Sequence, residues 1–158
     1  MSAPNSVNVG SIEEAGVSGE IEPNRVCTMP VLLGFCIGNG ASYAALYISG
    51  LVFLWVLVAQ GVAPEQVYAR AYQSTPYLVY AHILGFLSMA PGGYWTARLS
   101  SGSPLRRTLF AGTLMSAFVV AQLAIPYDLP IPWWSQIASV VTPIPAFIAG
   151  MIWWKHRA

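Results

Sequence analysis

The chain alternates long apolar stretches with short polar connections. The apolar stretches cover about residues 41–60, 76–98, 104–125 and 132–154. Each holds roughly twenty residues, the length of α-helix that crosses a hydrocarbon core of about 30 Å. The pattern therefore predicts an all-α integral membrane protein with four transmembrane helices.

Proline and capping residues mark where two of these helices begin. Ser74-Thr75-Pro76 and Ser103-Pro104 each place a hydroxyl side chain before a proline, which favours the first turn of a helix. Pro91-Gly92-Gly93 interrupts the second helix, and Pro143 and Pro145 lie within the fourth. Because proline removes a backbone hydrogen bond, we expect kinks in the second and fourth helices.

The apolar region that contains the first span is too long for one straight crossing, since it extends from about residue 26 to 60. Gly38-Asn39-Gly40 is the natural place for a break. The sequence thus predicts a short interfacial helix over 28–38 before the first span. The alternative is a single long, tilted helix. A further short helix is expected from Pro64, in the loop that follows the first span.

Residues 1–25 differ from the rest of the chain. They are rich in Ser, Asn, Gly and Glu and contain no aromatic residue. Such a segment buries too little apolar surface to fold, so we expect a disordered acidic tail followed by one transmembrane domain over 26–158. Composition supports the membrane assignment, because 56% of the residues are hydrophobic and only 8% are charged, against about 25% charged in soluble domains.

The basic residues predict the orientation. Every Lys and Arg except Arg70 would lie on one side of the four spans. Cytoplasmic loops carry an excess of these residues, so both termini are expected in the cytoplasm of a cell-membrane protein. Trp133 and Trp134 would then lie at the outer interface, and Trp153 and Trp154 at the inner one. The net charge of +1 gives no basic field suited to nucleic acid.

His82 is the one ionisable side chain well inside a predicted span, and such residues are candidates for function. Gln122, Gln136 and Gln60 would lie at a similar outer depth, so the four could line a small ligand-binding cavity. The alternative is ordinary hydrogen bonding between helices. His82 could hold a haem or a quinone only if two chains each supplied one copy, and no cofactor is predicted.

The spacing of Cys27 and Cys36, with no histidine nearby, does not indicate a metal site. Motifs for nucleophilic, P-loop, zinc-protease and dinucleotide-binding enzymes are also missing. We therefore expect a non-enzymatic accessory, regulatory or immunity-type membrane component. It would contact the lipid bilayer and another membrane protein or a second copy of itself. The alternative function is a homo-oligomeric channel or transporter for a small solute, using the polar layer around His82.

Overall fold

The structure is a computed structural model that describes residues 28–125 and 131–157. Within these residues all regular secondary structure is helical. The helices are α1 (Thr28–Ala59), α2 (Pro64–Gln73), α3 (Thr75–Arg98), α4 (Pro104–Leu123), α5 (Trp133–Val141) and α6 (Pro143–Lys155). The predicted acidic tail over 1–25 and Cys27 lie outside the described residues.

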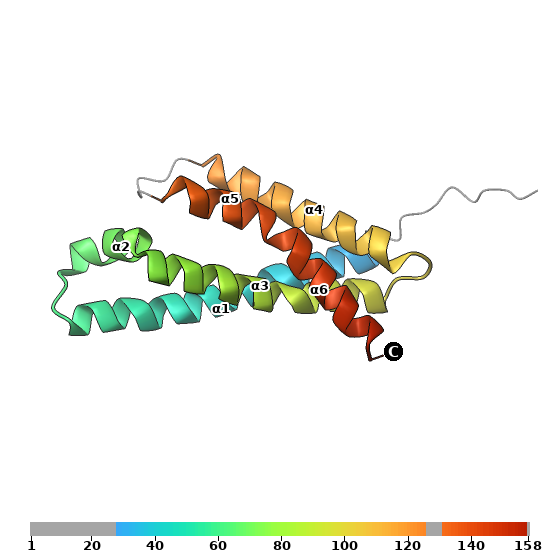
Figure 1. Ribbon diagram of the computed structural model, residues 1–158, viewed down its shortest axis with the longest axis horizontal. Coiled ribbons are helices and arrows are strands. Elements are labelled where there is room, and N and C mark those ends of the chain that lie inside the picture. Colours follow the sequence, from blue (N-terminus) through green and yellow to red (C-terminus); the bar gives the residue numbers. More distant parts are fainter. Residues whose placement is uncertain (1–27, 126–130, 158) are drawn as a thin grey trace, which may run out of the picture.

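The long helices lie lengthwise beside one another, and α3 lies between α1 and α6 (Figure 1). The hydrophobic core joins α1, α3, α4 and α6 at the end of the molecule that holds the C-terminus, and Phe147 is its largest fully buried side chain. The core residues are Val31, Met89, Ala111, Met115, Ala146 and Phe147. Toward the opposite end, α4 and α5 run above the α1–α3 pair, and α2 connects the end of α1 to the start of α3 (Figure 1). The bundle is therefore tightly packed at one end only.

The predicted break at Gly38-Asn39-Gly40 is wrong, because α1 is one helix of 32 residues. There is no separate interfacial helix over 28–38 within it. The reason lies in the contacts of the glycines. A side-chain carbon on Gly38 would lie 3.0 Å from the Phe147 ring, and one on Gly34 would lie 2.7 Å from the Gly92 carbonyl oxygen. These glycines permit close approach of α3 and α6, and this packing outweighs their low helix propensity.

Among the described residues, two helical segments are long and apolar enough to cross a membrane. They are α1, with 32 residues, and the stretch Trp133–Lys155, with 23 residues. Helix α3 passes through Pro91 without interruption, and α5 and α6 meet at Thr142, whose backbone is itself in the α region. The four-span topology and the kinks remain predictions.

The turn after α1 positions α2 beside the open end of the bundle. Gly61 adopts a left-handed backbone with φ of 83°. Its N–H donates to Val58 O at 2.9 Å, and the Val62 N–H donates to Leu57 O at 3.1 Å. This is the Schellman arrangement, which ends a helix and reverses the chain. Pro64 then starts α2, as the sequence predicted.

Candidate functional site

Two cavities occupy the loosely packed end of the bundle. The first, here the Gln122 cavity, has a volume of about 240 Å³ and lies between α1, α3, α4 and α5. The second, here the tyrosine cavity, has a volume of about 460 Å³ and is also walled by α2. Its wall contains Tyr43, Tyr47, Tyr68, Tyr72 and Tyr77. The predicted ligand-binding role of this region stays a prediction.

His82 contributes to the walls of both cavities. Its Nε2 atom lies 3.0 Å from the Ser135 hydroxyl oxygen, which joins α3 to α5. The direction of this hydrogen bond depends on the imidazole tautomer. The ring of His82 also meets the Trp134 ring edge-on, with 5.9 Å between ring centroids. His82 therefore has one ring nitrogen committed to Ser135 and stands where the two cavities share a wall.

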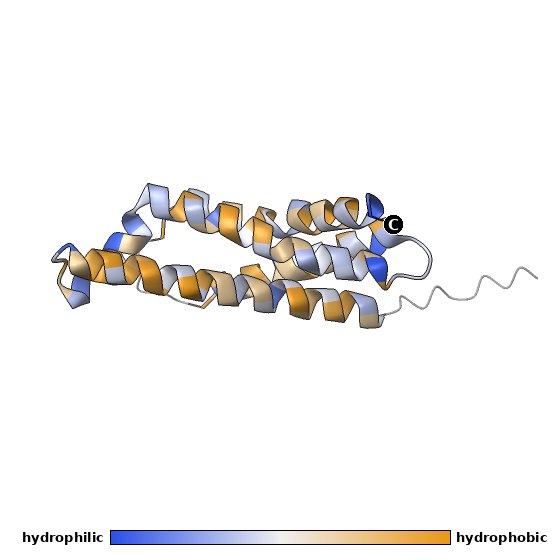
Figure 2. Ribbon diagram, turned by 90° about the horizontal axis from the view of Figure 1, so that it is seen from below, coloured by the Kyte–Doolittle hydropathy of each residue, from blue (hydrophilic) through white to orange (hydrophobic). Residues whose placement is uncertain are grey.

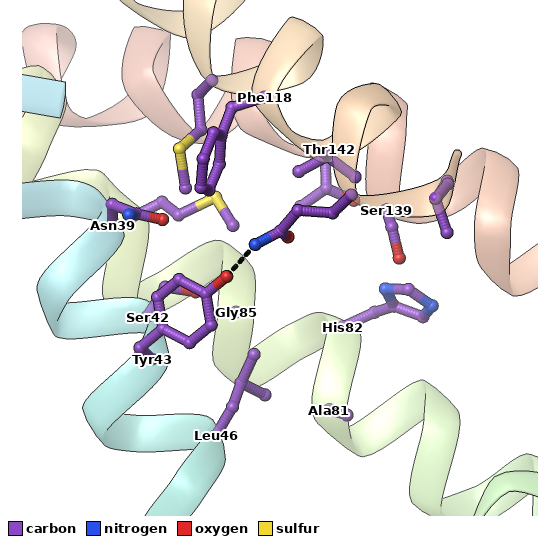
Figure 3. Close-up of a pocket in the computed structure, with 15 residues that line it drawn as sticks. Asn39, Ser42, Tyr43, Leu46, Ala81, His82, Gly85, Phe118, Ser139 and Thr142 are labelled. Carbon is purple, nitrogen blue, oxygen red and sulfur yellow. Dashed lines mark hydrogen bonds between the residues drawn. The ribbon is translucent and has the colours of Figure 1, made fainter. Parts of the chain in front are cut away.

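Gln122 and Tyr43 form the second polar contact of the site. The Gln122 side-chain amide donates to the Tyr43 hydroxyl and so links α4 to α1. Figure 3 marks this bond at the Tyr43 hydroxyl, beside Asn39 and Ser42. Asn39 precedes Tyr43 by four residues, so both side chains emerge on one face of α1. Both belong to the wall of the Gln122 cavity.

The other two polar residues predicted for the site, Gln136 and Gln60, do not lie in the same cavity. Gln136 belongs to the wall of the tyrosine cavity, where its amide donates to Ile131 O at 3.0 Å. Gln60 is exposed just after α1 and contributes to neither wall. The structure thus brings His82 together with Gln122 in one cavity and with Gln136 in the other. It does not form a single layer of four polar side chains.

Helix α5 supplies hydroxyl groups that the sequence reading missed. Ser139 belongs to both cavity walls, and Thr142 to that of the Gln122 cavity. Their hydroxyls donate back to carbonyls of their own helix, Ser139 to Ser135 O at 2.9 Å and Thr142 to Ala138 O at 2.6 Å. Ser135, Ser139 and Thr142 recur at helical spacing. That helical spacing is visible in the sequence and could have identified these residues.

Comparisons with protein-family models, curated proteins and solved structures found no match to this chain. The chemistry of the site therefore has to be read from its own residues.

The Ser135–His82 pair has the spacing of a nucleophile and a general base. Two observations favour a structural hydrogen bond instead. Ser135 is only 4% exposed, so its hydroxyl is covered by its surroundings. The cavity walls, as far as the described residues form them, include no carboxylate that could orient the other nitrogen of His82. Over the same residues, no three His, Cys, Asp or Glu side chains lie together as a metal site would require. Among the described residues, the polar groups in the two walls are thus amides, hydroxyls and one imidazole.

Proposed function

We propose that this chain is a four-span membrane protein whose spans are α1, α3, α4 and the α5–α6 stretch. Exposure along α1 supports the membrane location, because only 6% of its most apolar window is buried. The core helix of a soluble protein would be mostly buried. Helix α3 has 24 residues and α4 has 20, which correspond to about 36 Å and 30 Å of helix, enough to cross the hydrocarbon core.

The polar ends of the bundle support this topology. Hydrophilic residues gather at the two ends, with apolar helix between them (Figure 2). At the end near the C-terminus, the Arg98 guanidinium lies 4.9 Å from the Trp95 ring centroid, and that of Arg157 lies 5.1 Å from the Trp153 ring centroid. Tryptophan with arginine is typical of a membrane interface. We assign this end to the cytoplasmic side.

We propose that the protein binds a small molecule in the cavities beside His82 and acts as a non-enzymatic accessory or regulatory component. The observation that carries this proposal is the pair of cavities with His82 in their common wall. Ligand sites are typically apolar cavities with a few convergent polar groups. Binding is favoured over conduction because the bundle beyond the Gln122 cavity is filled by Met89, Met115 and Phe147.

An accessory role also needs a surface for a partner. Helix α1 exposes Tyr47, Ile48, Val52 and Trp55 along its second half. Lipid tails and a second membrane protein would both fit this apolar face, so the face itself does not choose between them.

Photolabelling in proteoliposomes tests the binding proposal. The probe is 3-(trifluoromethyl)-3-phenyldiazirine, a small uncharged molecule that inserts into nearby bonds on illumination. Met89 and Met115 are 8% and 2% exposed, so a probe reaches them only by entering the Gln122 cavity. We expect label at these residues to saturate as the probe concentration rises, measured by mass spectrometry of peptides.

Exposed Ile48 and Trp55 provide the internal control, because probe dissolved in the lipid should label them in proportion to its concentration. Label confined to such exposed positions, with no saturable component at Met89 or Met115, would overturn the proposal.

A further inference from the structure

We infer that the ligand is an uncharged molecule with a single aromatic ring and one hydrogen-bonding oxygen, and that the Gln122 cavity holds the ring. Simple phenols belong to this chemical class. The inference rests on the proposed function and deepens it, because it assigns a ligand chemistry to the same cavities.

The charge of the ligand follows from the walls. Among the described residues, neither cavity wall contains Asp, Glu, Lys or Arg. The polar groups present are amides, hydroxyls and the His82 imidazole. Taking an ion out of water into such surroundings is costly unless an opposite charge or a dense set of hydrogen bonds compensates. The walls therefore select an uncharged ligand.

The size of the ligand follows from the volume of the Gln122 cavity. A protein cavity of about 150 Å³ holds one benzene molecule. At about 240 Å³, the Gln122 cavity has room for one ring with a small substituent. The tyrosine cavity, at about 460 Å³, can take a longer substituent, since His82, Tyr43 and Ser139 belong to both walls.

The aromatic character follows from the apolar side of the Gln122 cavity. Met89, Met115 and Phe118 form part of this side. Methionine sulfur and aromatic edges make favourable contacts with an aromatic ring. Phe118 is itself held edge-on by Phe35, with 5.6 Å between ring centroids. A rigid aromatic wall of this kind suits a flat ring better than a flexible chain.

The single oxygen follows from the polar side. The Tyr43 hydroxyl accepts from Gln122 and keeps its own proton for a further acceptor. Asn39 lies one helical turn away and makes no side-chain hydrogen bond to another described residue. In Figure 3, Asn39 and Tyr43 lie on α1 across the cavity from Ser139 and Thr142. One ligand oxygen near Tyr43 and Asn39 would use the groups that the fold leaves available.

Gly85 offers a way to fill this cavity without disturbing its walls. Gly85 is buried, belongs to the wall of the Gln122 cavity, and a side-chain carbon built on it meets nothing within 4 Å. Gly85→Leu should therefore occupy the ligand space. Gly40→Leu is the matched control, because Gly40 is equally free of neighbours but is exposed and belongs to neither wall. Gly85→Ala is a milder second variant should the larger side chain impair folding.

Competition against the saturable photolabel at Met89 and Met115 tests the inference. The competitors are 4-ethylphenol, benzoate and phenethylammonium, which have similar sizes and differ in charge. Each concentration is corrected for the measured partitioning of the competitor into liposomes of the same lipid. We expect 4-ethylphenol to compete at concentrations at least about tenfold lower than either ion, because an ion in the cavity lacks a countercharge.

In Gly85→Leu, saturable label at Met89 and Met115 should fall by at least about tenfold, because the new side chain projects into the ligand space. It should remain in Gly40→Leu and decrease partly in Gly85→Ala. Equal competition by the ions, or saturable label that persists in a folded Gly85→Leu protein, would overturn the ligand assignment and leave the binding proposal standing. The absence of any saturable label in the unmodified protein would instead remove the binding proposal itself.

Discussion

At the residue scale, the packed end of the bundle depends on glycines that have no room for a side chain. A side-chain carbon on Gly93 would lie 2.6 Å from Phe147 Cα and would overlap the Phe147 carbonyl. Gly93→Ala must therefore push α3 and α6 apart, and overpacking of this kind costs about 1–3 kcal/mol. We expect a lower thermal unfolding midpoint by circular dichroism in detergent.

Gly40→Ala is the control for this prediction, because a methyl group at Gly40 meets nothing within 4 Å. It should leave stability unchanged or raise it by up to about 1 kcal/mol through better helix propensity. Equal stability of the Gly93→Ala and Gly40→Ala proteins would contradict the close α3–α6 packing.

Single residues also show which parts of the candidate site could be predicted from the sequence. His82 stands out in the sequence because a titratable residue in an apolar stretch needs a partner, and the structure supplies Ser135. Asn39 and Tyr43 were not predicted as site residues. Asn39 between two glycines resembles a turn, and only the packing of α1 against α3 and α4 decides which of its faces points inward. Long-range packing of this kind leaves no local signal.

At the scale of elements, hydroxyl residues and prolines predicted the starts of helices correctly, whereas glycines predicted a break inside α1 that the structure does not have. Helices α3 and α4 start at Thr75 and Pro104, where hydroxyl residues and prolines stand in the sequence. Glycine has different structural roles at the end of a helix and inside one. At Gly61 it ends a helix through a left-handed backbone, whereas at Gly34 and Gly38 it is a contact surface inside a helix. The residue type alone does not distinguish these uses.

Continuity of α1 can be measured by the distance between two spin labels. Leu32 and Ile48 are 50% and 62% exposed and flank Gly38-Asn39-Gly40. With Cys27 and Cys36 replaced by serine, nitroxides at these two positions should give one narrow distribution near about 24 Å, the length of an unbroken helix. A broad or much shorter distribution would contradict the single helix.

Ile83 and Leu99 have the same separation in sequence, and Pro91 lies between them. The kink predicted near Pro91 should shorten this second distance relative to the first. Equal distances for the two pairs would argue against the kink.

At the scale of the whole molecule, the tightly packed core and the cavities lie toward opposite ends of the long axis. The glycine contacts and Phe147 hold the end near the C-terminus together, and the cavities occupy the other end. A molecule with a rigid end and an open end can admit a ligand without disturbing the contacts that hold it together. Because the cavities lie toward the end opposite the basic residues, the proposed topology places them in the outer half of the membrane.

That topology can be tested with two single-cysteine variants in a cysteine-free background. Ser101 lies in the exposed turn between α3 and α4, near Arg106 and Arg107, whereas Gln66 lies in exposed α2 at the opposite end. The excess of basic residues on the Ser101 side should retain it in the cytoplasm. A membrane-impermeant maleimide should therefore label Gln66→Cys in intact cells, and Ser101→Cys only after permeabilisation. Labelling of Ser101→Cys but not of Gln66→Cys in intact cells would reverse the orientation and move the cavities to the cytoplasmic half. Labelling of both variants would mean that α3 does not cross the membrane, because α3 alone separates these two positions within the fold.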